Sequence, residues 1–183
     1  MIFDTETTVD ASQRLRFGTY LIRNEKEPEK QEQGIFYVPD DPTALSAADI
    51  ETIKAYAVAH HQTLRTVEDF IKNVFYEYGY NFRATIVAFN LPFDLSRLAI
   101  NHEPCRQVTT TPGGDPEARH TDRTMVGGFT FQLLQQDYPR IRVKHLSSRD
   151  ALFQFWVKPR FKNNKRVKGG IHRRGHFVDV KTI

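Results

Sequence analysis

Two carboxylates stand two residues apart near the start of the chain, Asp4 and Glu6, in the sequence IFDTETT. Ile2 and Phe3 lead into Asp4 and predict a short strand, in which residues two apart project from the same face. Neighbouring carboxylates repel each other and favour a shared cation, and hard oxygen ligands select Mg²⁺ or Mn²⁺ over zinc or copper. An Asp-x-Glu pair alone is a weak signal, because many surface strands carry one by chance.

A third carboxylate, Asp94, follows the run ATIVAFN (84–90), whose continuous apolar character is typical of a strand buried on both faces. Asn90 ends this predicted strand, Pro92 breaks it, and Asp94 opens the next predicted helix. Open α/β sheets place their chemistry at the carboxyl edge of such strands. The structural alternative for Asp94 is an N-cap, a position that Asp favours strongly.

Together, FDTET and NLPFD resemble the first and second motifs of the DEDD family of 3′–5′ exonucleases. NLPFDLSRLA and the late FVDVKTI are most similar to exonuclease domains related to family B DNA polymerases. The resemblance implies a ribonuclease-H-like sheet. It matches Asp4, Glu6 and Asp94 to three of the family's four catalytic, metal-binding acids. It also matches Asn90 to a polar residue of the second motif, which we expect to contact nucleic acid.

The resemblance further implies two-metal hydrolysis of phosphodiester bonds at single-stranded 3′ ends. The two Mg²⁺ or Mn²⁺ ions are expected roughly 3.5–4 Å apart, with Asp4 bridging them. The expected substrate is single-stranded nucleic acid, with DNA favoured over RNA; the sequence does not decide between DNA and RNA, or between proofreading, repair and processing. Basic and aromatic side chains should track its backbone and stack on its bases.

The family's fourth acid belongs to a helix after the last strand, within HxxxxD or YxxxD, and the sequence stops just after FVDVKTI. We therefore expect a chain truncated before that motif, with a polymerase or other domain missing. His145 and Asp150 fit HxxxxD, but their flanks predict strands joined by a turn, whereas the motif requires a helix. Two other functions stay open: an inactive nucleic-acid-binding remnant of such a domain, and an interaction module with accidental motifs.

Positive charge is concentrated near the end of the sequence. The net charge is +4, yet residues 151–178 contain eight Lys and Arg and no acid, which leaves −4 on the rest of the chain. We expect this basic segment to bind a polyanion, although a solvated surface loop is the more ordinary interpretation. The nucleic-acid-binding candidates within it are Lys162, Lys165, Arg166, Lys168, Arg173 and Arg174.

The remaining pattern predicts a single 183-residue α/β domain with a ribonuclease-H-like mixed central sheet flanked by helices and an additional antiparallel ribbon. Helix start signals occur at Ser46 and Thr66, and residues 158–175 are predicted to form a basic loop. No apolar run approaches the ~20 residues of a membrane helix. Cys105 is the only cysteine, so no internal disulfide can form, and a reducing, cytoplasmic setting is expected. The predicted strands are 1–4, 17–22, 34–38, 84–90, 129–134, 140–146, 151–157 and 176–180.

Overall fold

The computed structural model divides by its contacts into two compact units, each described by itself below. Unit 1 comprises Met1–Leu98 and Arg174–Ile183, and unit 2 comprises Ala99–Arg173. For residues 123, 158–162 and 165–172 the structure describes the backbone alone. The described residues are 1–24, 27, 31–105, 123–135, 138–147, 150–162, 165–172 and 174–180.

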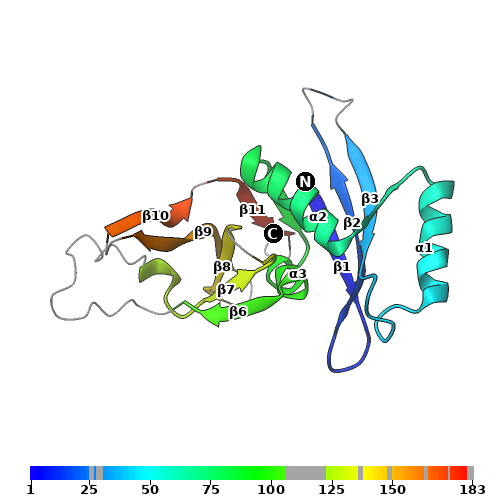
Figure 1. The fold of residues 1–183 in the computed structure, drawn as a ribbon, viewed down its shortest axis with the longest axis horizontal. Coiled ribbons are helices and arrows are strands. Elements are labelled where there is room, and N and C mark those ends of the chain that lie inside the picture. Colours follow the sequence, from blue (N-terminus) through cyan, green and yellow to red (C-terminus); the bar gives the residue numbers. More distant parts are fainter. Residues whose placement is uncertain are drawn as a thin grey trace. The chain divides into compact units, whose positions relative to one another are not determined.

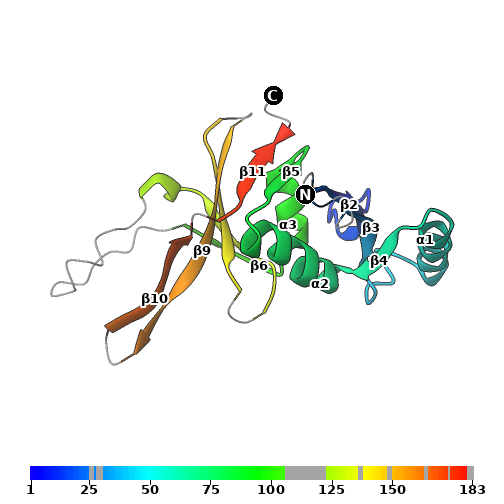
Figure 2. The same ribbon diagram turned by 90° about the horizontal axis from the view of Figure 1, so that it is seen from above.

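Unit 1 is built on a mixed six-stranded sheet with the order β11-β5-β1-β2-β3-β4. The strand β1 pairs antiparallel with β2, and β2 pairs antiparallel with β3. On the other side of β1, β5 is parallel to β1 and β11 is parallel to β5. Figure 2 shows β5 and β11 side by side. The edge strand β4 is parallel to β3. The bounds are β1 Ile2–Thr7, β2 Leu15–Ile22, β3 Glu32–Tyr37, β4 Thr63–Thr66, β5 Thr85–Ala88 and β11 His176–Asp179.

Helices cover this sheet where the sequence signals place them. The helix α1 (Ala47–Ala59) begins at the predicted capping box of Ser46 and Asp49. At the second signal, the Thr66 side chain accepts from the Asp69 N–H and caps α2 (Val67–Phe70). This helix continues as the π-helix η2 (Ile71–Asn81), and α3 (Leu91–Leu98) follows β5. Figure 2 shows α2 and α3 on one side of the sheet and α1 on the other.

Aromatic rings form the core beneath α2 and η2. The ring of Phe70 stacks on Phe36 with centroids 4.0 Å apart and also contacts Phe3 and Tyr20. Phe75 meets Phe3 edge-on at 5.9 Å. Phe3 is opposite Tyr20 in the register, and Phe36 is opposite Gly18, two residues before Tyr20. The three rings therefore project from the same face of three neighbouring strands, the face that packs against these helices.

Unit 2 is a five-stranded antiparallel sheet with the order β10-β9-β8-β7-β6 (Figure 1). Its core includes Ile141, Val143 and Phe155, which are all nearly inaccessible. The short 3-10 helix Arg123–Met125 precedes β7. The strands are β6 Asn101–Pro104, β7 Phe129–Gln132, β8 Arg140–His145, β9 Ala151–Lys162 and β10 Lys165–His172.

The prediction of a basic loop over residues 158–175 is wrong for most of the segment. Residues 158–162 extend β9, and residues 165–172 form β10 at the edge of the sheet. The sequence pattern misled because a highly charged segment was taken for a loop. Charge does not prevent an edge strand, since lysines on an edge strand also discourage pairing with other chains.

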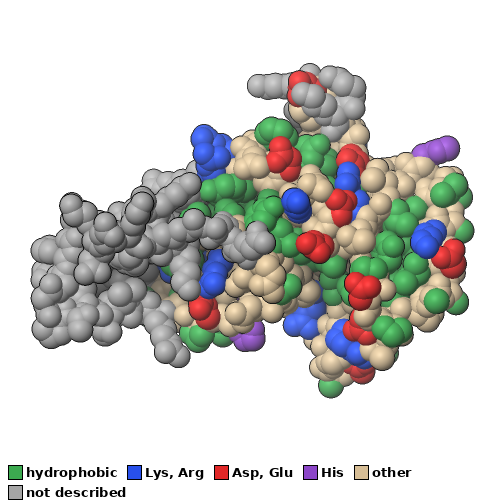
Figure 3. Space-filling view, in the orientation of Figure 1, with side chains coloured by type: hydrophobic (Ala, Val, Ile, Leu, Met, Phe, Trp, Pro, Cys, Tyr) green, Lys and Arg blue, Asp and Glu red, His purple; other side chains and the backbone are tan. Residues whose placement is uncertain are grey.

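The coarse fold prediction is confirmed: a mixed α/β structure whose mixed central sheet is flanked by helices, with a separate antiparallel sheet. Within the described part of the chain, no helix combines the length and apolar character needed to cross a membrane. On the face presented in Figure 3, acidic and basic side chains of the described residues are interspersed rather than gathered into one patch.

Candidate functional site

The strand β1 presents Asp4 and Glu6 as predicted. Both residues are exposed, while the alternating Phe3 and Thr5 are buried against the helices at 1% and 7% exposure. Asp4 lies opposite Thr19 and Glu6 opposite Phe17 in the register with β2. The two carboxylates therefore occupy the sheet face opposite the one that Phe3 and Thr5 pack.

Asp94 reaches the carboxyl end of the sheet on α3. The strand β5 ends at Ala88, the chain turns through Phe89 and Asn90, and α3 begins at Leu91. The Asn90 carbonyl accepts the Asp94 N–H at 3.1 Å, which makes Asn90 a backbone anchor for the first turn. Asp94 is the fourth residue of this helix and only 2% exposed, so the N-cap alternative does not describe its position.

One carboxylate oxygen of Asp94 accepts a side-chain hydrogen bond and the other has no partner. The Thr5 hydroxyl donates to Asp94 Oδ1 at 2.6 Å in a buried hydrogen bond. The second oxygen, Oδ2, is buried without a hydrogen-bond partner. Buried polar atoms are normally paired, and an unpaired one calls for an explanation such as a proton or an ion.

Burial raises the pKa of the Asp94 carboxyl to about 6, because the charged form loses its hydration. The hydrogen bond from the Thr5 hydroxyl opposes this rise by favouring the ionised form, as do weaker hydrogen bonds from the backbone of Thr5 and Asn90, whereas the negative charge of Asp4 adds to it. Asp4 and Asp94 thus interact electrostatically although they approach from different elements. The result is a carboxyl that changes charge near neutrality, a property that is common in functional sites.

The three predicted acids do not form one compact cluster. Among the residues that the structure describes, no group of three Asp, Glu, His or Cys side chains is placed to hold a metal ion. The chemistry of the donor set nevertheless fits a divalent cation, because Asp94 has a buried carboxylate oxygen without a partner and its charge interacts with that of Asp4. The residues that could hold such an ion are Asp4, Glu6 and Asp94.

Asp179 contacts the start of α3. It ends β11 opposite Ala88 of β5, and its Oδ1 accepts the Leu91 N–H at 3.4 Å. A carboxylate near the first turn of a helix pairs with exposed N–H groups and with the positive end of the helix dipole. Its geometry therefore gives Asp179 a structural role at the end of β11.

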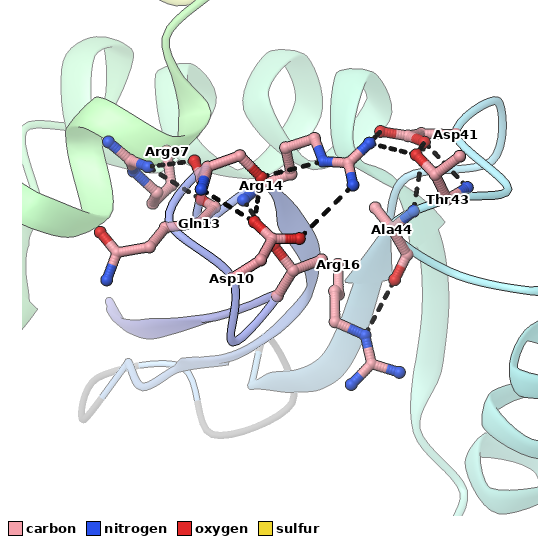
Figure 4. A network of polar contacts seen from close by, with 10 residues as sticks. Asp10, Gln13, Arg14, Arg16, Asp41, Thr43, Ala44 and Arg97 are labelled. Carbon is pink, nitrogen blue, oxygen red and sulfur yellow. Dashed lines mark hydrogen bonds and ion pairs between the residues drawn. The ribbon is translucent and has the colours of Figure 1, made fainter.

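The surface side of α3 is tied to the turn between β1 and β2. Figure 4 shows Arg97 reaching this turn, where its Nη1 donates to the Gln13 carbonyl at 2.8 Å and to that of Ser12 at 3.5 Å. Gln13 has a φ of 45°, a left-handed conformation that a non-glycine residue adopts only when its surroundings enforce it. The helix that carries Asp94 and the hairpin that carries Asp4 are thus joined at the surface as well.

The same turn is braced on its other side by charged residues (Figure 4). Arg14 lies 3.6 Å from Asp10 and 3.6 Å from Asp41, and it donates to the Thr43 hydroxyl. Hydrogen bonds from Ser12 lower the pKa of Asp10, so this carboxylate stays ionised to a lower pH than an ordinary aspartate. Exposed ion pairs of this kind contribute little individually, so we assign the network a local role in ordering the turn.

The predicted nucleic-acid contacts are only partly described. Arg174 lies over the ring of Tyr80 at 5.2 Å within unit 1. Asn90 is half-buried at the start of α3. The side chains of Lys162, Lys165, Arg166 and Lys168, and all of Arg173, lie outside what the structure describes, so their predicted role stays a prediction.

His145 and Asp150 belong to a turn in unit 2, as their strand-like flanks indicate. His145 ends β8, and Asp150 precedes β9. The Ser147 hydroxyl donates to the Asp150 carboxylate at 2.8 Å, and the Asp150 N–H returns a hydrogen bond to that hydroxyl at 3.0 Å. The helix that the HxxxxD motif requires is absent from the described residues 138–147 and 150–162.

Two residues of this site escape the motif analysis, Thr5 and Arg97. The alternation of β1 indicates that Thr5 faces away from Asp4 and Glu6, but it does not reveal that Asp94 approaches from that side. Arg97 lies three residues after Asp94 and reads in the sequence as an ordinary solvated helix residue. Comparisons of the chain with protein-family models, with curated proteins and with solved structures gave no match.

Proposed function

We propose that this chain is a metal-dependent 3′–5′ exonuclease domain with a ribonuclease-H-like sheet, acting on single-stranded DNA. The observation that carries the proposal is the buried Asp94 carboxylate with an unpaired oxygen, under the electrostatic influence of Asp4. A site for a divalent cation explains both its burial and its missing partner, since the ion would neutralise the carboxylate that burial otherwise disfavours.

The arrangement of strands supports this proposal independently of the motifs. A ribonuclease-H-like sheet consists of three antiparallel strands followed by two strands parallel to the first, in the order 3-2-1-4-5. In unit 1, β3, β2, β1, β5 and β11 follow this order and these directions, and β4 is an added edge strand. Asp94 then follows the fourth strand of that pattern, where the resemblance expects the acid of the second motif.

In this proposal the residues of the chain hold and orient the reacting groups. Asp4, Glu6 and Asp94 would bind the ions, which supply an activated water and stabilise the leaving 3′ oxygen. Phe89 precedes Asn90 and is 67% exposed, so its ring is available for stacking with a base of the substrate. The positive charge of residues 158–174 would attract the phosphate backbone.

The proposal is tested with a single-stranded DNA labelled at its 5′ end and incubated with Mg²⁺ or Mn²⁺. The wild-type chain should shorten it stepwise from the 3′ end, and Asp4→Ala should abolish shortening. Asp150→Ala is the matched control, because Asp150 is also exposed but belongs to the turn of unit 2. Equal shortening by the wild-type and Asp4→Ala chains would refute the proposal. Loss of activity in Asp150→Ala instead would move the active site to the HxxxxD motif.

A second candidate is a non-catalytic nucleic-acid-binding domain that retains the fold. The observation that favours it is that the described residues hold no three-ligand group for a metal. This domain would bind single-stranded DNA with a steep dependence on salt concentration, and it would leave the labelled strand intact with either metal. Binding without degradation therefore separates this candidate from the exonuclease.

A further inference from the structure

Thr5 occupies an unusual place between the two acids of β1. Its neighbours Asp4 and Glu6 are exposed on one face of the sheet, whereas its own side chain is buried on the other. There it meets the only described acidic residue that is itself almost fully buried, Asp94. The contact joins two segments that are 89 residues apart in the sequence.

The backbone leaves room for this contact at the edge of β1. The strand β5 meets β1 at its beginning, through the pair of Ile2 and Val87 and through hydrogen bonds of Met1 with Thr85 and Val87, and β5 ends at Ala88. Beyond that point α3 packs against β1 in place of a neighbouring strand. Asp94 therefore approaches β1 at Thr5 and meets the inward-facing hydroxyl instead of the outward-facing carboxylates.

The hydrogen bond constrains the Asp94 carboxylate in a specific way. An ionised carboxylate only accepts hydrogen bonds, so the Thr5 hydroxyl is the donor at 2.6 Å to Oδ1. Hydrogen bonds to a charged acceptor are stronger than neutral ones and hold geometry more firmly. With Oδ1 occupied, Oδ2 is the oxygen that has no protein partner.

We infer that Thr5 is a positioning residue of the proposed metal site: its hydroxyl fixes the Asp94 side chain and leaves Oδ2 available for a divalent cation. The inference rests on the proposed function. Metal-binding carboxylates are commonly oriented by such partners, and removing the partner typically weakens metal affinity by ~10–100-fold. Thr5 thus acts on the metal through Asp94 and does not itself need to touch the ion or the DNA.

Thr5→Val tests this inference because valine keeps the shape of threonine and removes only the hydroxyl. We expect the Kd of Mn²⁺, measured by the loss of its free electron paramagnetic resonance signal, to rise by ~10–100-fold. Thr5→Ser restores the donor and should bind Mn²⁺ within a few-fold of the wild-type chain. Thr130→Val is the matched control, because Thr130 is equally buried, in unit 2, and its hydroxyl meets Cys105 Sγ at 3.1 Å.

A purely structural role for Thr5 predicts a different pattern. In that case Thr5→Val and Thr130→Val would both lower thermal stability, and neither would change Mn²⁺ affinity. If Thr5→Val fails to fold, Thr5→Ser and Thr5→Ala decide, because both lack the methyl group and only Thr5→Ala lacks the donor.

The outcomes separate the inference from the function on which it rests. Equal Mn²⁺ affinity in the wild-type and Thr5→Val chains would overturn the positioning role alone. A wild-type chain that binds no Mn²⁺, or binds it equally well after Asp94→Asn, would overturn the proposed function and the positioning role together. Weak Mn²⁺ binding by Thr5→Ser as well as by Thr5→Val would also refute the positioning role, since the serine hydroxyl supplies the donor.

Discussion

Asp94→Asn should stabilise the fold at neutral pH while removing the proposed function. Each tenfold change in proton affinity is worth about 1.4 kcal/mol. A pKa raised from 3.8 to about 6 therefore means that ionised Asp94 costs the folded state about 3 kcal/mol. Asparagine removes this cost and its carbonyl can accept from Thr5. The amide group of the asparagine would lie buried where Oδ2 has no partner, and this offsets about 1–3 kcal/mol of the stabilisation.

The pH dependence isolates this effect from other consequences of the substitution. The cost of ionising Asp94 is absent below its unfolded pKa of 3.8 and complete above its folded pKa of about 6. Wild-type stability therefore loses about 1.5 kcal/mol relative to Asp94→Asn between pH 5 and pH 8. Urea denaturation of both chains at the two pH values measures this difference.

Two results would refute the reasoning about Asp94. A difference in unfolding free energy that stays constant from pH 5 to pH 8 would mean that Asp94 titrates as an ordinary exposed carboxyl. A loss of stability at pH 8 in Asp94→Asn would mean that the charge is stabilising without metal. With millimolar Mn²⁺, ligand linkage should raise the stability of the wild-type chain and leave Asp94→Asn unchanged.

Other substitutions test the framework that positions the site. Phe70→Ala should lower the unfolding free energy by about 3–5 kcal/mol because Phe70 is fully buried, with Phe70→Leu less severe in the same denaturation assay. Gly18→Ala should cost about 1–3 kcal/mol and weaken Mn²⁺ binding, since a Cβ there would clash with the Phe36 ring and with the Asp4 carbonyl oxygen; unchanged affinity would contradict this. Arg97→Ala should cost about 1–2 kcal/mol and raise the Kd of Mn²⁺ by freeing the turn at Gln13, with Arg97→Lys intermediate.

Local signals in the sequence were sufficient for most elements of unit 1. The capping box at Ser46 and the cap at Thr66 begin helices because each satisfies backbone N–H groups within one turn of chain. The β4 strand, by contrast, has only four residues and depends on pairing with β3. Strand order across β1 depends on contacts between distant segments, which periodicity does not encode.

The basic segment shows the opposite limitation. Its composition predicts a charged loop, whereas the structure has two strands there. The reason is that β9 and β10 are specified by backbone pairing with each other. Residues such as Lys162 and Lys165 are opposite each other in that register. Like charges at paired positions disfavour a strand pair, and this is why the sequence alone favours a loop there.

The site was predictable in its residues but not in its geometry. Alternation along β1 places Asp4 and Glu6 together, and the run before Asn90 places Asp94 at the carboxyl end of a neighbouring strand. The sequence pattern does not indicate that β5 ends before it reaches the level of Thr5. This early end allows α3 to bring Asp94 to the face of β1 opposite Asp4 and Glu6. A cation shared by Asp4 and Asp94 would therefore have to bind at the edge of β1 where α3 packs, between the two faces. The hydroxyl of Thr5 and the guanidinium of Arg97 both hold α3 at that edge, one from the core and one from the surface.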